Sequence, residues 1–294
     1  MPRLWFGPAG KPIALKSSDI LLAPPLLKEM GLNAMEYEAV RGVNIREEKA
    51  KALGVEANLK GIKLSLHAPY FINLAGRKGV VEASIMRLNE SVKASAWMGA
   101  YIVVFHPGYY KDALSRGDAL KKVIENIKPV IEYRDQLGFK AVWLGPETTG
   151  KTSQVGDLRE VIEISRNLGG VRPVVDFAHL YARSGGKFIK SKDDVLSVLS
   201  LIEKELGSWA LKPLHTHFSK IEYGKGGERE HHTLSEDAYG PDFSPVCAAL
   251  CEQNVDSVII SESPVLEQDA LVMLKICKET CGDSCVVEQA QKES

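Results

Sequence analysis

Histidines and carboxylates in this chain stand where predicted β-strands end. The chain has seven histidines, and each lies at the end of such a strand or in the loop after it. They are His67, His106, His179, His215, His217, His231 and His232. Carboxylates in the same kind of position are Glu147, Asp176, Glu228 and Glu262. Imidazole and carboxylate groups are the ligands that hold Zn²⁺, Mn²⁺ or Fe²⁺ in proteins. The pattern therefore predicts a catalytic site that contains several metal ions.

Two kinds of segment alternate along the 294 residues. Short runs rich in Val, Ile, Leu and aromatic residues predict strands at 4–7, 34–40, 62–68, 101–107, 140–147, 172–178, 214–220 and 257–263. A 3.6-residue apolar period predicts helices at 19–30, 46–57, 79–98, 116–137, 155–168, 191–208, 244–253 and 267–280. Eight strands that alternate with eight helices, with no Pro/Gly/Ser-rich linker between them, predict one (β/α)₈ TIM barrel.

That fold brings the strand ends together. In a TIM barrel the C-terminal ends of the strands meet on one face, where catalytic groups are normally found. The third to eighth strands all end in ligand-type residues, from His67 to Glu262. A single histidine is more often a hydrogen-bonded core or surface residue than a ligand. Six consecutive strand ends of this kind favour a shared metal site.

Composition indicates which binding partners and which cellular compartment to expect. The 37 basic and 38 acidic residues give a net charge of −1, so no basic excess indicates nucleic-acid binding. The N-terminal residues lack the apolar core of a signal peptide, and no run of about 18 apolar residues predicts a membrane span. We expect a cytoplasmic monomer that does not contact membranes. We expect residues 1–281 to form the barrel and residues 282–294 to form a flexible tail.

Five cysteines lie in the last two helices and the segment after them: Cys247, Cys251, Cys277, Cys281 and Cys285. Their CxxxC spacing places neighbouring cysteines on one helical face, whereas structural zinc motifs usually use CxxC-like turns. We expect small buried apolar side chains here, because free cysteine is commonly buried. A disulfide or redox role is the alternative.

Seven segments in order resemble the motifs of the endonuclease IV family of apurinic/apyrimidinic endonucleases. They are HAPYFINLAG (67–76), FHPG (105–108), PETTGKTSQVGDL (146–158), DFAH (176–179), HTHFSKIEYG (215–224), GEREHHTL (227–234) and ESP (262–264). The resemblance covers almost the whole barrel, from about His67 to Pro264. It implies a TIM barrel with three metal ions, usually Zn²⁺ with Mn²⁺ as an alternative. It also implies cleavage of duplex DNA at the phosphodiester 5′ to an abasic site.

The resemblance also implies a ligand set. His67 and His106 bind one metal, and Glu147 bridges this metal to a second. The second metal is completed by Asp176, His215 and Glu262. Glu147 and Glu262 flank the metal-bound hydroxide and act as catalytic residues. His217 is expected to hydrogen-bond to a ligand without being one.

The third metal site departs from the family's pattern at one ligand. The resemblance implies that His179 and His231 hold it, but the family's Asp two residues before the second histidine is Arg229 here. Glu228 is the expected substitute, and Glu230 paired with His232 is the alternative. For substrate binding, the resemblance implies Tyr70 at the lesion. In the altered loop after the second strand, Arg41 is the only plausible groove reader.

Charge and residue count separate the possible functions. Five neutral histidines and four carboxylates sum to −4, and three divalent ions would leave +2 before a hydroxide binds. We therefore expect the metals to attract phosphate. A sugar isomerase or epimerase is the alternative, because relatives on this barrel use one metal, for which Glu147, Asp176, His215 and Glu262 suffice. His67, His106, His179 and His231 are surplus for one metal. A non-catalytic metal-binding or nucleic-acid-binding barrel is the third possibility.

Overall fold

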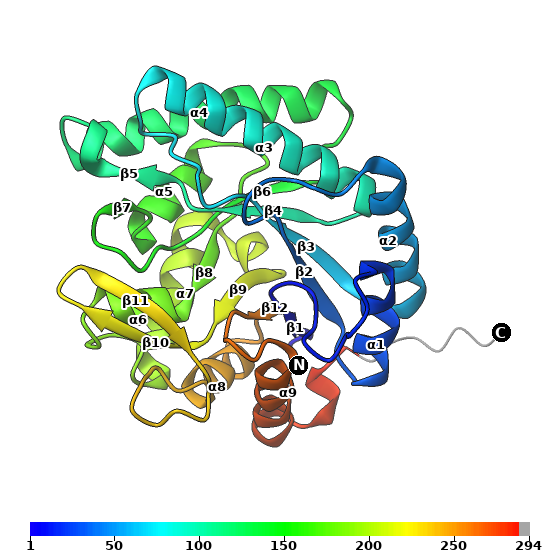
Figure 1. Cartoon of the computed structure of the whole chain (residues 1–294). Helices are drawn as coiled ribbons and strands as arrows, with labels where there is room; N and C mark the ends of the chain where they lie inside the picture. Colours follow the sequence, from blue (N-terminus) through cyan, green and yellow to red (C-terminus); the bar gives the residue numbers. More distant parts are fainter. Residues whose placement is uncertain (288–294) are drawn as a thin grey trace.

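Eight parallel strands form a closed barrel in the computed structural model, which describes residues 1–287 (Figure 1). The strands are β1 (Leu4–Pro8), β2 (Ala34–Glu38), β3 (Lys63–His67), β4 (Ile102–Phe105), β6 (Trp143–Pro146), β8 (Val174–Asp176), β9 (Leu214–Phe218) and β12 (Ser257–Ser261). They pair in the orders β2-β3-β4-β6 and β8-β9-β12-β1. Parallel bridges from Ala9 to Glu36 and from Glu147 to Val174 join the two sheets. The predicted TIM barrel is confirmed, with all eight strands in their predicted places.

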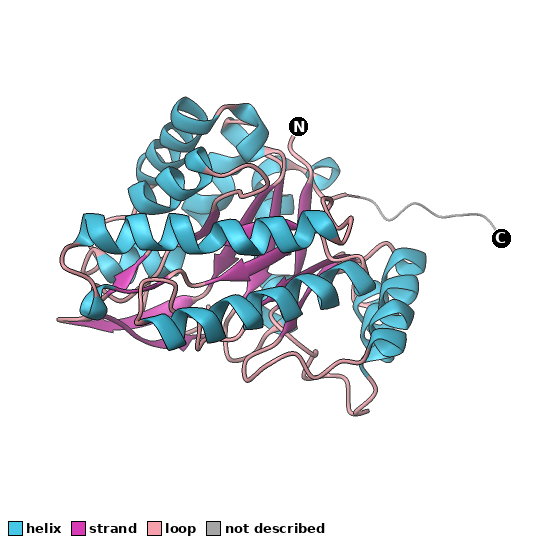
Figure 2. Ribbon diagram, turned by 90° about the horizontal axis from the view of Figure 1, so that it is seen from above, coloured by secondary structure: helices cyan, strands magenta, loops and turns pink. Residues whose placement is uncertain are grey.

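Helices surround the strands (Figure 2). They are α1 (Ala23–Glu29), α2 (Glu47–Lys60), α3 (Lys78–Met98), α4 (Arg116–Gln136), α5 (Leu158–Asn167), α6 (Phe177–Arg183), α7 (Lys192–Leu206), α8 (Ser244–Glu252) and α9 (Glu267–Cys281). Four 3₁₀ helices are η1 (Ile20–Leu22), η2 (Tyr110–Asp112), η3 (Ser208–Leu211) and η4 (Asp283–Cys285). Among residues 1–287, no helix is long and apolar enough to cross a membrane.

Local capping explains where two of these helices begin. Asp157 accepts a hydrogen bond from the backbone N–H of Glu160, whose side chain reaches back to the N-cap backbone, so α5 starts with a capping box. Ser191 and Asp194 form the same arrangement before α7. Both caps lie where the sequence predicts a helix start, so the loops that lead into these helices are held in place.

One helix and two pairs of strands were not predicted from the sequence. Helix α6 follows directly on β8, with Asp176 as its N-cap residue. Strands β5 (Gly108–Tyr109) and β7 (Gln154–Val155) pair above the barrel. Strands β10 (Lys220–Gly224) and β11 (Gly227–His232) form an antiparallel hairpin in a segment whose polar, Gly-rich sequence predicts a loop. This hairpin extends at the lower left of Figure 1.

The C-terminal part differs from the predicted tail. Residues Asp283–Cys285 form η4, and Cys285 is buried. Val286 forms a parallel bridge to Leu4, and the backbone N–H of Val287 donates to the carbonyl of Leu4. Two residues beyond the predicted boundary at Cys281, Val286 and Val287, therefore pair with β1. Residues 288–294 of the predicted tail lie outside the described residues.

Candidate metal centre

Glu147 occupies the centre of the site. It follows β6 and is completely buried, with each carboxylate oxygen facing two histidines. Its Oε2 lies 3.3 Å from Nε2 of His67 and 3.0 Å from Nε2 of His106. Its Oε1 lies 3.3 Å from Nδ1 of His179 and 3.1 Å from Nδ1 of His217. A carboxylate between two pairs of imidazoles is placed to bridge two metal ions.

His67, His106 and Glu147 form the first group that can hold an ion, with ligand atoms within 4.8 Å of one another. The Nδ1 of His67 donates to the carbonyl of Ala68 at 2.7 Å, so its Nε2 faces Glu147. Burial favours the neutral ring, but hydrogen bonding and negative charge from Glu147 outweigh it and raise the pKa of His67 to about 10. In the metal-free protein this imidazole therefore carries a proton that a metal would displace.

A second group consists of Glu147, Asp176, His179 and Glu262. One oxygen of Asp176 accepts the backbone N–H of His179 at 2.7 Å and caps α6, whereas Oδ2 is buried without a hydrogen-bond partner. Burial raises the pKa of Asp176 to about 7. An unpartnered buried carboxylate oxygen is costly in a protein, and coordination to a cation removes that cost. This observation supports the fit of a metal ion.

The structure differs from the prediction in its choice between His215 and His217. His217 Nδ1 lies 3.1 Å from Glu147 and 3.3 Å from Glu262, whereas His215 contacts neither and hydrogen-bonds to Tyr101 at 2.7 Å. Both side chains point into the barrel because alternate residues of a strand share one face. His217 is two residues nearer the C-terminal end of β9, so it lies at the depth of Glu147, and His215 lies one layer deeper.

The third group, His179, Glu228 and His231, is built partly on the β10–β11 hairpin. Nε2 of His179 lies 3.5 Å from Glu228, and Nε2 of His231 lies 3.9 Å from the same carboxylate. Glu230 pairs with Glu222 and Glu228 with Tyr223, so Arg229 is an extra residue in β11.

This β-bulge shifts the alternation of side chains along β11 by one residue. Glu228 and His231, three residues apart, consequently face the same side. His232 lies elsewhere, 3.0 Å from Glu236 and stacked on Tyr239. The structure thus brings together the predicted pair Glu228/His231 and leaves Glu230/His232 outside the group.

Gly150 allows the third group to be compact. A β-carbon at this position would lie 2.6 Å from Cβ of Glu228 and 2.9 Å from Cδ2 of His179. The carbonyl of Gly150 also accepts the backbone N–H of Glu228 at 3.1 Å. The loop after β6 therefore holds the hairpin against the barrel through a residue that has no side chain.

Glu36 is a functional candidate that the sequence reasoning missed. It is fully buried on β2, and its carboxylate lies 2.9 Å from Nε2 of His217, 3.0 Å from Nε2 of His215 and 2.7 Å from Oγ of Ser65. A carboxylate behind a histidine fixes the orientation of the ring toward a metal. Alternation along β2 places residues 34, 36 and 38 on the interior face, which is the signal that identifies this position.

Glu38 adds a second interior carboxylate and changes the predicted charge. Burial raises the pKa of Glu38 to about 8, so this group is mostly neutral at pH 7. Glu36, Glu147, Asp176, Glu228 and Glu262 contribute −5 when ionised, so three divalent ions leave +1, not the predicted +2. Further positive charge comes from Lys151, whose Nζ lies 3.9 Å from Glu228.

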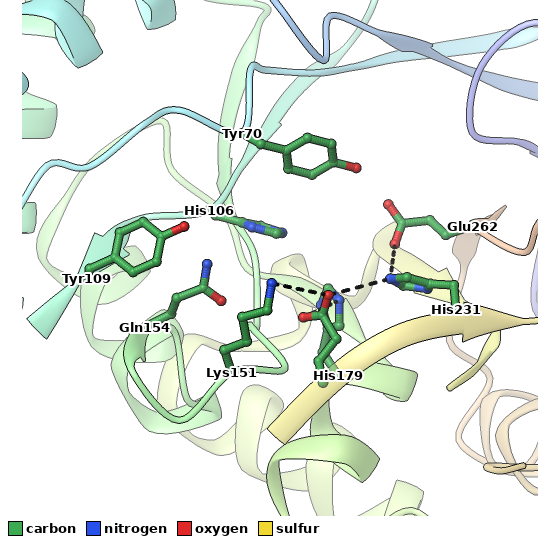
Figure 3. Close-up of a pocket in the computed structure, with 9 residues that line it drawn as sticks. Tyr70, His106, Tyr109, Lys151, Gln154, His179, His231 and Glu262 are labelled. Atoms are coloured by element: carbon green, nitrogen blue, oxygen red, sulfur yellow. Dashed lines mark ion pairs between the residues drawn. The ribbon is translucent and has the colours of Figure 1, made fainter. Parts of the chain in front are cut away.

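A cavity of about 280 Å³ opens above the three groups (Figure 3). Its lining residues are Tyr70, His106, Tyr109, Lys151, Gln154, His179, Glu228, His231 and Glu262. The ring of Tyr70 lies 5.5 Å from that of His106, so this predicted substrate-binding residue borders the cavity. The other predicted substrate-binding residue, Arg41, is exposed in the loop after β2 and does not line the cavity.

Comparisons with known proteins place the chain in a family. The profile of the xylose isomerase-like TIM barrel family matches residues 24–277. An uncharacterised protein of Methanocaldococcus jannaschii is 39% identical over 94% of this chain and 97% of its own length. A probable endonuclease 4 of Staphylococcus carnosus is 30% identical over 63% of this chain and 64% of that protein, a little under two thirds.

Solved structures show the same fold at low identity. Endonuclease IV from Thermus thermophilus has a TM-score of 0.68 at 18% identity, covering 95% of this chain and 98% of that one. A D-tagatose 3-epimerase-like protein has a TM-score of 0.66 at 19% identity, covering 88% and 91% of the two chains. Nucleases and sugar epimerases thus share this barrel. On the profile match and the closed barrel, the chain belongs to the xylose isomerase-like TIM barrel family.

Proposed function

We propose that this protein is a metal-dependent endonuclease that cleaves duplex DNA at the phosphodiester 5′ to an abasic site. The observation that carries the proposal is the size of the ligand set. Glu147 contacts four histidines, and His179, Glu228 and His231 form a further group beside it. One divalent ion takes about four to six protein and water ligands, so this set is too large for a single ion.

We assign the ions to three positions. His67 and His106 hold the first, and Glu147 connects it to the second. Asp176, His217 and Glu262 complete the second, with His217 in place of His215. His179, Glu228 and His231 hold the third. Zn²⁺ is the expected ion because histidine nitrogen and carboxylate oxygen are its common ligands, and Mn²⁺ is the alternative.

Divalent ions held by these residues would lower the pKa of bound water and would neutralise phosphate oxygens. The chain's own residues supply the orientation. In the metal-free protein Glu262 is ionised, since positive charge and a hydrogen bond from His217 outweigh burial and lower its pKa to about 2; bound cations would favour the same charge. Glu147 and Glu262 therefore remain negative and accept hydrogen bonds from a nucleophile between them. Lys151 at the rim is placed to contact a phosphate, and Tyr70 covers one side of the cavity.

Relatives named as probable endonucleases support the proposal at the level of sequence. The probable endonuclease 4 of S. carnosus is 30% identical over 63% of this chain. We propose that the protein acts as a monomer on DNA, since the eight strands close the barrel within one chain.

A sugar isomerase or epimerase is the second candidate. Glu147, Asp176, His217 and Glu262 alone make a one-metal set, and the cavity volume of about 280 Å³ is near the lower end of small-molecule sites. Such an enzyme needs neither His106 nor His231. The role of these two histidines therefore separates the candidates.

The test uses two adjacent histidines as a matched pair. Metal-loaded protein is incubated with a labelled duplex that contains one tetrahydrofuran abasic analogue. We expect incision on the 5′ side by the parent and by His232→Ala, with at least about 100-fold less by His106→Ala and His231→Ala. No incision by the parent, together with epimerisation of a ketohexose, would instead establish the sugar enzyme.

A further inference from the structure

Four cysteines on two neighbouring helices form a further set of possible metal ligands, on the helices outside the barrel. Helices α8 and α9 are connected by disulfides from Cys247 to Cys277 and from Cys251 to Cys281, which corrects the expectation of separate buried thiols. The Cα atoms lie 5.6 Å and 6.0 Å apart in the two pairs. Both pairs are separated by 30 residues, so the helices run parallel and in register.

Three of the four sulfurs lie within one group, and the fourth, that of Cys277, is bonded to one of them. Residues four apart on a helix are about 6 Å apart along its axis. The diagonal distance from Sγ of Cys247 to Sγ of Cys281 is nevertheless only 3.7 Å. Cys247, Cys251 and Cys281 present sulfur atoms that all lie within 4.8 Å of one another.

We propose that, when reduced, Cys247, Cys251, Cys277 and Cys281 bind one thiophilic divalent ion as a tetrathiolate site. A tetrahedral ion with metal–sulfur bonds of about 2.3 Å separates its sulfurs by about 3.8 Å. The diagonal pair already has this spacing. Side-chain rotation alone can bring the other sulfurs to it, because each pair of α-carbons is already close.

Burial also suits such a site. Cys247 and Cys277 are fully buried, which shields the ion, whereas Cys251 and Cys281 are only partly buried and leave a path of entry. Cys285 is not part of the set, because its thiol lies against the carbonyl of Cys277 at 3.6 Å. The site would connect the helices that precede and follow β12, the strand that Glu262 directly follows.

The chemistry balances with a dithiol reductant. Each disulfide takes up two electrons and two protons, and the reductant becomes a disulfide in turn. The four resulting thiols lose four protons to solvent as the ion binds. Oxidation reverses these steps and releases the ion, so the cluster has a metal-bound reduced form and a metal-free disulfide form.

Binding of Co²⁺ to thiolates gives an optical signal that the barrel histidines cannot produce. The full chain is reduced with dithiothreitol, desalted without oxygen and titrated with Co²⁺. We expect a thiolate-to-cobalt charge-transfer band whose final intensity corresponds to one thiolate-bound ion per chain, because ions bound by the barrel groups, which contain no sulfur, do not contribute to it. In the double variant Cys251→Ser/Cys281→Ser the intensity of this band should fall at least tenfold. Cys285→Ser is the matched control, and its band should keep the parent's intensity.

A measurement on the parent chain covers the case in which the double variant fails to fold. Zinc-loaded reduced protein is titrated with a mercurial thiol reagent, and released Zn²⁺ is measured with a chelating dye. One ion released in step with four modified thiols supports the proposal. A reduced parent that shows free thiols by alkylation and mass spectrometry, but neither the cobalt band nor thiol-linked zinc release, would overturn it. The nuclease proposal would be unaffected.

Discussion

The barrel part and the hairpin part of the candidate metal centre are held in different ways. His67, Glu147 and His217 are almost completely buried where barrel strands end, and their positions follow from closure of the sheet. Glu228 and His231 instead lie on β11, where the side chain of His231 is 25% exposed. The hairpin group depends on a bulge and a glycine, so local changes should disrupt it while the barrel group persists.

The largest effect should come from removing the central charge. Glu147→Gln keeps the shape but loses the negative charge that faces four histidines. We expect loss of the first two ions and a fall in incision rate of at least about 10³-fold. Metal content and single-turnover cleavage check this. A variant that kept both ions and more than a tenth of the activity would contradict a bridging role.

A smaller and selective effect is expected at Gly150. Gly150→Ala places a methyl group against Glu228 and His179 and should displace the hairpin. We expect loss of one ion, retention of two, and about 10- to 100-fold slower cleavage. Gly169→Ala is a suitable control because no atom lies within 4 Å of a β-carbon built there. Loss of all ions from Gly150→Ala would show that the two parts are not separable.

The support behind His217 should matter less than the ligands. Glu36→Gln removes the charge that orients this ring and should weaken binding of the second ion by about 10- to 100-fold. Competition with a chelator measures the affinity. Replacing His215 by Asn should leave the number of bound ions unchanged, whereas His217→Asn should reduce it. The reverse pattern would restore His215 as the ligand.

The smallest expected effect is on proton release. The pKa of His67 is raised to about 10 in the metal-free protein, so at pH 7 its ring is protonated and a metal must displace that proton. Metal affinity should therefore rise with pH between about 6 and 9. Calorimetry in buffers of different ionisation enthalpy measures the number of protons released when metal binds. If the parent and His67→Asn released the same number, the result would contradict this prediction.

Sequence reasoning predicted the barrel and most of the residues that meet in the candidate metal centre, because the periodic pattern and the strand ends are local features. The choice between His215 and His217 could not be made locally, since both alternate onto the same face and only their depth in the barrel separates them. Glu36 was hidden within an otherwise ordinary strand. The bulge at Arg229, which joins Glu228 to His231, depends on pairing with β10 and therefore on tertiary structure.

Anomalous diffraction at the zinc edge from crystals of zinc-loaded protein tests the central claim most directly. We predict three peaks in the barrel, two on either side of Glu147 and one among His179, Glu228 and His231. Any ion between α8 and α9 would be distinguished by its position. A single barrel peak among Glu147, Asp176, His217 and Glu262 would contradict the three-metal account.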